Sequence, residues 1–503
     1  MRAFVLTLAS LAAGCGAAAA GEGARPELAA WTYTFTVDPS LTRLEATVCF
    51  EGPPPSALTP IDAAGARYLR GAEGPLGPEA APLSVEGRAI ATAHLPPDAC
   101  VAYVVDLDAA ARQRGGLHGA YRIDGDLIAA TGVWLWAPRE RAEDARVTAR
   151  FELPDDVRLS PLWARAGGGR HRLDERAFRF TAYAAFGRFE TVNVGVPGAC
   201  LHVSVLGGGV RMGTDGLVRS LRGSADAVSM MFGEFPVRRA SILAVPTPFS
   251  TTSPFGIVGR GTLPTVAILV GDRAEEARLA RAWVPVHELA HLAMPFVDRE
   301  DAWLAEGIAT YYQEILRARA GLFPPEQAWR NLDDGFRRGA RDGTGRSLRE
   351  ESRDMMRTAA YRRVYWAGAA IALLADVEMR ARSNGRRSLD DALERLRDCC
   401  ADRTAPMSGR EALERLDAEM PGVIAPIARR WLGADEFPDL RAAYARLGLT
   451  RSEDGLGIDP SLETRTLREA IVAPRVDLAP IPRCGPHRAD RSEASTESTP
   501  PNP

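Results

Sequence analysis

The pentapeptide His287-Glu288-Leu289-Ala290-His291 decides how the rest of this sequence is interpreted. On a helix, residues four apart lie on one face, so both imidazoles can bind one zinc ion. Pro285, just upstream, is well placed in the first turn of such a helix. Glu288 then projects beside the ion, where it can act as a general base towards water that the metal acidifies. Because the whole chain of 503 residues holds only seven histidines, this spacing is improbable by chance.

A catalytic zinc site takes three protein ligands and leaves one position open, so a third donor must come from elsewhere in the chain. Residues 303–312 read Trp-Leu-Ala-Glu-Gly-Ile-Ala-Thr-Tyr-Tyr and predict a second helix, which begins near Asp298 or Asp301. The apolar positions of this helix share one face, so Glu306 lies on the opposite face. A loop at Pro295 would turn the chain back, so that the Glu306 carboxylate can aim at the metal.

These motifs resemble those of the gluzincin metallopeptidases, in which the glutamate of a W-L-x-E-G segment on the following helix is the third zinc ligand. The resemblance implies that His287, His291 and Glu306 bind one Zn²⁺ ion and that Glu288 is the catalytic base. A later segment, Val364-Tyr365-Trp366-Ala367-Gly368, resembles the Y-x-K-G segment of the alanyl aminopeptidase family. That resemblance implies that Tyr365 stabilises the oxyanion, although an alanine stands at the basic position.

Within the gluzincins the sequence is most similar to the glycyl-aminopeptidase-like family, which is related to the alanyl aminopeptidases. The similarity rests on the short ligand spacing, on the helix that runs from Tyr365 towards Arg380, on Arg387-Ser388-Leu389-Asp390-Asp391 and on Leu447-Gly448-Leu449. Alanyl-type relatives hold the substrate's amino terminus with a glutamate on an edge segment. The corresponding stretch here, residues 255–261, contains no acidic residue.

Composition excludes several other classes of function. With 46% apolar and 25% charged residues, most of the chain is globular. All 62 basic residues are arginines, so the lysine-dependent chemistry of P-loop enzymes, protein kinases and pyridoxal enzymes is excluded. The net charge of −3, with arginines spread along the chain, argues against nucleic-acid binding.

The N-terminus and the cysteines indicate an exported bacterial protein. Residues 1–20 have the charged, apolar and small-residue pattern of a signal peptide. Cleavage is expected either before Cys15, which would become a lipid anchor and the protein's only membrane contact, or after Ala20. The expected location is therefore periplasmic, secreted or lipid-anchored in the envelope. The six remaining cysteines favour disulfides, and the strand-like runs around Cys49 and Cys100 make this pair the preferred bridge.

The hydrophobic pattern divides the chain into parts. Residues 28–195 alternate with period two and predict an antiparallel β domain. Residues 196–400 predict an α+β catalytic domain, which the resemblance implies is thermolysin-like. Residues 401–480 predict a helical C-terminal region, and residues 485–503 a solvated tail.

We expect a zinc metallopeptidase that hydrolyses peptide bonds in peptide or protein substrates, in the aminopeptidase or the endopeptidase mode. Two alternatives remain open: an exported zinc-binding scaffold without peptidase activity, and a zinc hydrolase that acts on a non-peptide substrate.

Overall fold

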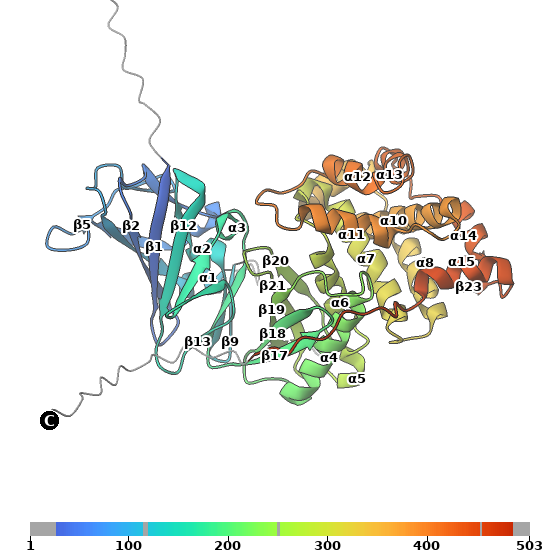
Figure 1. The fold of residues 1–503 in the computed structure, drawn as a ribbon, viewed down its shortest axis with the longest axis horizontal. Helices are drawn as coiled ribbons and strands as arrows, with labels where there is room; N and C mark the ends of the chain where they lie inside the picture. The colour runs from blue at the N-terminus through green and yellow to red at the C-terminus, as the bar shows by residue number, and fades with distance from the viewer. Residues whose placement is uncertain (1–26, 114–118, 249–251, 453–454, 486–503) are drawn as a thin grey trace, which may run out of the picture.

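The computed structural model describes residues 27–113, 119–248, 252–452 and 455–485. Three regions follow one another along the chain in Figure 1: a sheet-rich N-terminal region, a smaller mixed α/β region and a helical C-terminal part. The predicted multidomain fold class is confirmed. The predicted signal peptide, Cys15 and all but the first residue of the predicted tail lie outside the described residues. No helix within the described ranges is long and apolar enough to span a membrane.

The N-terminal region is built on an eight-stranded sheet that is antiparallel except where β1 and β12 pair in parallel. The aromatic residues of β1 are buried at alternate positions, as the period-two pattern predicts. The strand order is β14 (Ala164–Gly167), β15 (Arg170–Leu173), β12 (Arg141–Glu152), β1 (Leu28–Val37), β2 (Arg43–Phe50), β8 (Cys100–Asp106), β4 (Leu69–Gly74) and β5 (Ala81–Pro82).

Two four-stranded sheets and several short helices complete this region and share its hydrophobic core. The sheets are β13 (Arg158–Leu159), β16 (Tyr183–Gly187), β10 (Asp126–Ala130) and β9 (Ala120–Ile123), and β11 (Trp136–Pro138), β3 (Ala57–Pro60), β7 (Ala89–Ala91) and β6 (Val85–Glu86). The short helices are η1 (Ala63–Tyr68), α1 (Leu107–Arg112), α2 (Thr131–Trp134) and α3 (Glu175–Arg179).

The middle region carries a five-stranded sheet ordered β17 (Glu190–Val196), β18 (Ala199–Val205), β19 (Arg239–Thr247), β21 (Thr265–Gly271) and β20 (Gly256–Gly259). The central three strands are parallel and the two edge strands antiparallel. Alternate residues of β19 enter different cores: Ile242 packs with the helices, and Leu243 with the N-terminal region. Burial on both faces explains the nearly continuous apolar runs of β19 and β21.

Helices α4 (Gly213–Ser229), α5 (Glu276–Leu279) and α6 (Trp283–Ala290) belong to the middle region, and α4 and α6 pack against the sheet and each other. The short turns η3 (His291–Ala293) and η4 (Arg299–Asp301) lead into the helical part. That part contains α7 (Ala302–Arg319), α8 (Pro325–Arg341), α9 (Leu348–Thr358), α10 (Tyr361–Ser383), α11 (Leu389–Cys400), α12 (Gly409–Asp417), α13 (Ile424–Leu432), α14 (Arg441–Leu447), the hairpin β22 (Leu449–Ser452) and β23 (Gly455–Ile458), and α15 (Leu462–Val472).

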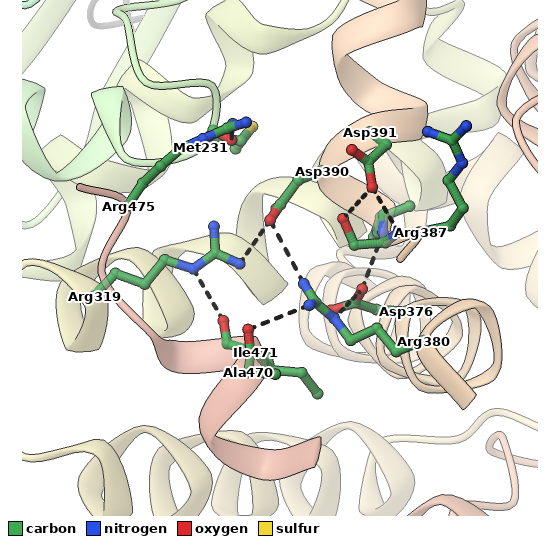
Figure 2. A network of polar contacts seen from close by, with 12 residues as sticks. Met231, Arg319, Asp376, Arg380, Arg387, Asp390, Asp391, Ala470, Ile471 and Arg475 are labelled. Carbon is green, nitrogen blue, oxygen red and sulfur yellow. Dashed lines mark hydrogen bonds and ion pairs between the residues drawn. The ribbon is translucent and has the colours of Figure 1, made fainter. Parts of the chain in front are cut away.

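A buried charge network ties four of these helices together (Figure 2). Asp390 at the start of α11 accepts a 2.8 Å hydrogen bond from Arg319 of α7 and lies 3.6 Å from Arg380 of α10. Arg380 also bonds Asp376 at 2.9 Å. Both arginines donate in addition to backbone carbonyls at the end of α15, at residues 470 and 471. The network fixes α7, which carries Glu306, and α10, which carries Tyr365.

Disulfides join cysteines both near and far apart in the sequence. The predicted bridge between Cys49 and Cys100 is present, because these residues face each other in the register of β2 and β8. Cys200 pairs with Cys484, and the adjacent Cys399 and Cys400 pair with each other. The bridge at Cys484 fastens the extended C-terminal segment, which runs from α15 back to β17 in Figure 1.

Candidate metal centre

Helix α6 presents both histidines of the pentapeptide from one turn of chain. It begins at Trp283, so Pro285 lies in the first turn, and His291 caps its end. The two imidazole centroids are 4.8 Å apart, and the rings are nearly perpendicular. The side chain of His287 is 3% exposed and that of His291 is 11% exposed. The imidazole rings of His287 and His291 are therefore close together and largely shielded from solvent.

Helix α7 places the predicted third donor against these rings. Glu306 Oε2 lies 3.2 Å from Nε2 of His287 and 3.5 Å from Nε2 of His291. Ligands around a tetrahedral zinc ion, each about 2.1 Å from the metal, are about 3.4 Å apart. Among the described residues, this is the one group of three His, Cys, Asp or Glu side chains close enough to hold a metal ion. Its donor types and separations fit zinc.

Gly307, which follows Glu306, allows α7 to approach α10 closely. A Cβ atom on Gly307 would overlap Gly368 of α10 and lie 2.9 Å from the backbone nitrogen of Ala369. Helices α7 and α10 therefore touch backbone to backbone, which brings Glu306 and Tyr365 to the same site. Asp301 occupies the N-cap position of α7, as predicted, but its carboxylate accepts the backbone N–H of Gly409 and forms no capping bond.

Electrostatics at the three donors favour a bound cation. Burial alone would raise the pKa of the Glu306 carboxyl, but positive charge on His291 and a hydrogen bond from His287 hold that pKa well below its usual range. Burial likewise disfavours the charged imidazole of His287, yet the Glu306 and Glu288 carboxylates raise its pKa. A divalent ion would satisfy the same carboxylates without requiring protons on the rings.

Glu288 lies between the candidate metal ligands and the edge strand β20. Burial raises the pKa of its carboxyl, and charge on His287 and His291 opposes this rise. A Cβ atom at Gly256 of β20 would overlap Cγ of Glu288 and lie 3.0 Å from its Cδ. Gly256 is therefore required for the glutamate to occupy this place. No strand among the described residues pairs with the outer edge of β20, so an extended peptide could add there as a further strand.

Tyr365, in the first turns of α10, faces the same centre. Its ring is parallel to that of His287, with the centroids 5.9 Å apart. Burial, followed by the charge of the Glu306 carboxylate, raises the pKa of its phenol well above the ordinary value. The hydroxyl is therefore protonated at neutral pH and can donate a hydrogen bond.

Two residues that support the site, Gln313 and Arg260, were not identified from the sequence. Gln313, seven positions after Glu306 on α7, places Oε1 2.9 Å from Nδ1 of His287. Its own amide nitrogen donates to Glu314 at 3.0 Å, which fixes the amide's orientation. Nδ1 of His287 therefore donates its hydrogen to Gln313, which leaves Nε2 free to bind a metal.

Arg260, after β20, fastens the end of the pentapeptide helix. Its guanidinium donates to the carbonyl oxygens of His291, at 2.6 Å, and Met294, at 2.7 Å. Burial, aided by the nearby charge of Arg176, lowers the pKa of Arg260 to about 10, so it remains cationic at neutral pH. Residues 255–261 contain no acidic residue, but they contribute the Arg260 guanidinium, which binds the C-terminal end of α6.

Comparisons with known proteins agree with this geometry. The model of the M61 glycyl aminopeptidase family matches residues 295–371, which include Glu306 and Tyr365. The predicted resemblance to the glycyl-aminopeptidase-like gluzincins is confirmed. Aminopeptidase O of Mus musculus is 32% identical over 130 residues, which are 22% of this chain and 14% of that protein. The chain therefore spans a small part of the curated relative that it matches.

Solved structures show the same fold. An aminopeptidase N family protein from Idiomarina loihiensis superposes with a TM-score of 0.67 at 15% identity, over 86% of this chain and 82% of that one. A two-domain M1 zinc metallopeptidase variant bound to L-arginine superposes with a TM-score of 0.52 at 16% identity, over 82% of this chain and 95% of that one. Taken together, one segment of the chain is similar to the M61 glycyl aminopeptidase family, and the fold is similar to that of M1 metallopeptidases.

Proposed function

We propose that this protein is a zinc-dependent peptidase in which His287, His291 and Glu306 hold a single ion. The observation that carries the proposal is the convergence of these three donor atoms from two helices, all within 4.8 Å of one another. Zinc would be held by neutral imidazole nitrogens and one carboxylate, as in other catalytic sites of this type. When bound, such an ion supplies Lewis acidity that acidifies water and polarises a carbonyl group.

The chain's own residues complete the reaction. Glu288 takes the proton from the attacking water and passes it to the leaving amine. Tyr365 donates a hydrogen bond to the oxyanion that develops on the scissile carbonyl. The free edge of β20 aligns an extended peptide, so the scissile carbonyl comes to lie beside Glu288. Peptides and proteins are therefore the proposed substrates.

Metal analysis and a peptide library test this function together. We expect about one zinc ion per purified chain and peptide cleavage that a chelator abolishes. Glu288→Gln should keep its zinc and lose turnover, whereas His287→Ala and Glu306→Ala should lose zinc. Glu300→Gln, an exposed glutamate just before α7, is the matched control and should behave as wild type.

Other results would contradict the peptidase function. Stoichiometric zinc with no cleavage of any peptide would instead indicate a scaffold. Chelator-sensitive hydrolysis confined to non-peptide esters or amides would indicate a different hydrolase. The ends of the fragments would distinguish attack at the amino terminus from internal cleavage.

We further propose that the protein works outside the bacterial cytoplasm. The signal-like residues 1–20 and three disulfides support this location, because such bridges persist in oxidising compartments. Fractionation of cells that express the full chain tests it, with labelled palmitate added to detect a lipid on Cys15. Protein confined to the cytoplasm with reduced cysteines would contradict the proposal.

A further inference from the structure

A cavity of about 500 Å³ opens beside the candidate metal centre, within the size range of pockets that bind small ligands. Trp283, Gln313 and Tyr365 line this cavity, and all three contact the ring of His287. The cavity therefore adjoins the ring of His287, although none of the three candidate metal ligands lines it. None of the roles assigned above to the metal ligands or to Glu288 uses this space.

The walls of the cavity are aromatic and in part exposed. Trp283 is 45% exposed and Tyr361 is 38% exposed, although both are large apolar side chains. Tyr365 and Trp366 continue the wall from α10. Exposed aromatic surface in a concave site is typical of ligand binding.

The buried carboxylate in the cavity wall is already paired. The Glu314 carboxylate is fully engaged, because it accepts from Gln313 and Asn331 and forms an ion pair with Arg317. Glu314 is therefore not a free acceptor for a ligand that enters the cavity.

One cation at the cavity has no ion-pair partner in the part of the chain that the structure describes. Arg362 pairs with Asp342 at 2.7 Å, and Arg317 is engaged with Glu314. Arg338, half-buried on α8, instead places its guanidinium 5.5 Å from the ring centre of Trp366. The remaining acid of the lining, Asp334, is exposed to solvent one turn away.

Two glycines of α8 allow Arg338 to lie on the ring of Trp366. A Cβ atom at Gly335 would overlap the Trp366 ring, and one at Gly339 would lie 2.6 Å from the Trp366 Cβ. Two glycines in a helix interior weaken α8 relative to alanine. They let the indole lie flat against α8, so Arg338 can stack on its face. A guanidinium held on an aromatic face presents its N–H groups at a fixed angle, which suits a carboxylate.

We propose that this cavity binds a carboxylate carried by the peptide substrate, with Arg338 as the recognising cation. The proposal deepens the proposed function and rests on it for the choice of a peptide as ligand. The carboxylate has two possible sources, the side chain of a glutamate or aspartate and the C-terminus of a short peptide. The aromatic wall packs on the chain that carries it.

Binding by calorimetry, in full-length zinc-loaded protein that carries Glu288→Gln, tests the proposal without depending on turnover. The ligands are alanine-rich hexapeptides with one glutamate placed at each position in turn, and the same set with glutamine. Each peptide is made with a free C-terminus and with a carboxamide, which separates the two sources of the carboxylate. We expect at least one carboxylate position to bind about tenfold tighter than its neutral match, because a charge-assisted hydrogen bond at a half-exposed site contributes about that factor.

Substitutions in α8 test whether Arg338 causes the preference for carboxylate peptides. Arg338→Gln should remove the difference between carboxylate and neutral peptides, and Arg338→Lys should retain part of it. Arg337→Gln, an exposed neighbour on the same helix, should leave the difference unchanged. Equal binding of carboxylate and neutral peptides would overturn the proposal. So would tighter binding of a lysine peptide that Asp334→Asn abolishes. Carboxylate preference in a protein that cleaves no peptide would refute the peptidase function and leave the cavity's role standing.

Discussion

Gly256→Ala tests whether the backbone of β20 sets the position of the catalytic glutamate. The added methyl group would overlap Cγ of Glu288 and lie 3.0 Å from its Cδ, whereas carbon atoms in contact are about 3.5–4.0 Å apart. Glu288 must therefore move by about 1 Å. Misplacement of a reacting group by that amount lowers rates about 100-fold, so we expect a loss in kcat of this order with zinc content unchanged.

Steady-state kinetics on a peptide that the wild type cleaves, together with metal analysis, check this expectation. Gly223→Ala is the matched control, because a Cβ atom there meets nothing within 4 Å, and it should keep full activity. A Gly256→Ala enzyme with wild-type kcat would refute the reasoning, since Glu288 would then tolerate displacement or take no part in the reaction. Loss of zinc from this variant would also refute it, because the three atoms nearest the methyl group belong to Glu288 and Ala267 and not to a ligand of the metal.

Three further predictions concern two residues of the candidate metal centre and one residue of the buried charge network. Tyr365→Phe should keep zinc and lose about two to three orders of magnitude in kcat, since one oxyanion donor is worth about 3–4 kcal/mol; an unchanged kcat would exclude this role. Gln313→Leu should weaken zinc binding about 10- to 100-fold in a chelator competition, because His287 loses the acceptor that orients its ring; unaltered affinity would contradict this. Arg319 holds the pKa of Asp390 below its ordinary value against the opposing effect of burial, so the stability from this pair is present above about pH 4 and is lost as pH falls further. Urea unfolding of Asp390→Asn should therefore show a shallower loss of stability than wild type between pH 5 and pH 3, and equal slopes would refute it.

Features with a local sequence pattern could be predicted from the sequence alone. The paired histidines and the glutamate of the next helix appear as short motifs, and helical periodicity assigns their faces. The bridge between Cys49 and Cys100 could be predicted because both lie in strand-like runs of one region. Alternation likewise predicted which residues of β1 are buried.

Features that depend on contacts distant in sequence were not predictable. Cys484 reaches Cys200 across 284 residues, a closure that no local pattern encodes. Gln313 follows the recognised motif directly, and its seven-residue offset from Glu306 places it two helical turns along the same face. That spacing was the available signal. Gly256 and Arg260 could not be interpreted before β20 was known to lie against α6, because their roles come from that contact alone.

The most direct test of the central claim is a crystal structure of the zinc-loaded protein, with anomalous scattering recorded at the zinc edge. We predict a single strong peak about 2.0–2.2 Å from Nε2 of His287, Nε2 of His291 and a carboxylate oxygen of Glu306. A peak elsewhere, or a Glu306 carboxylate turned away from both imidazoles, would contradict the account.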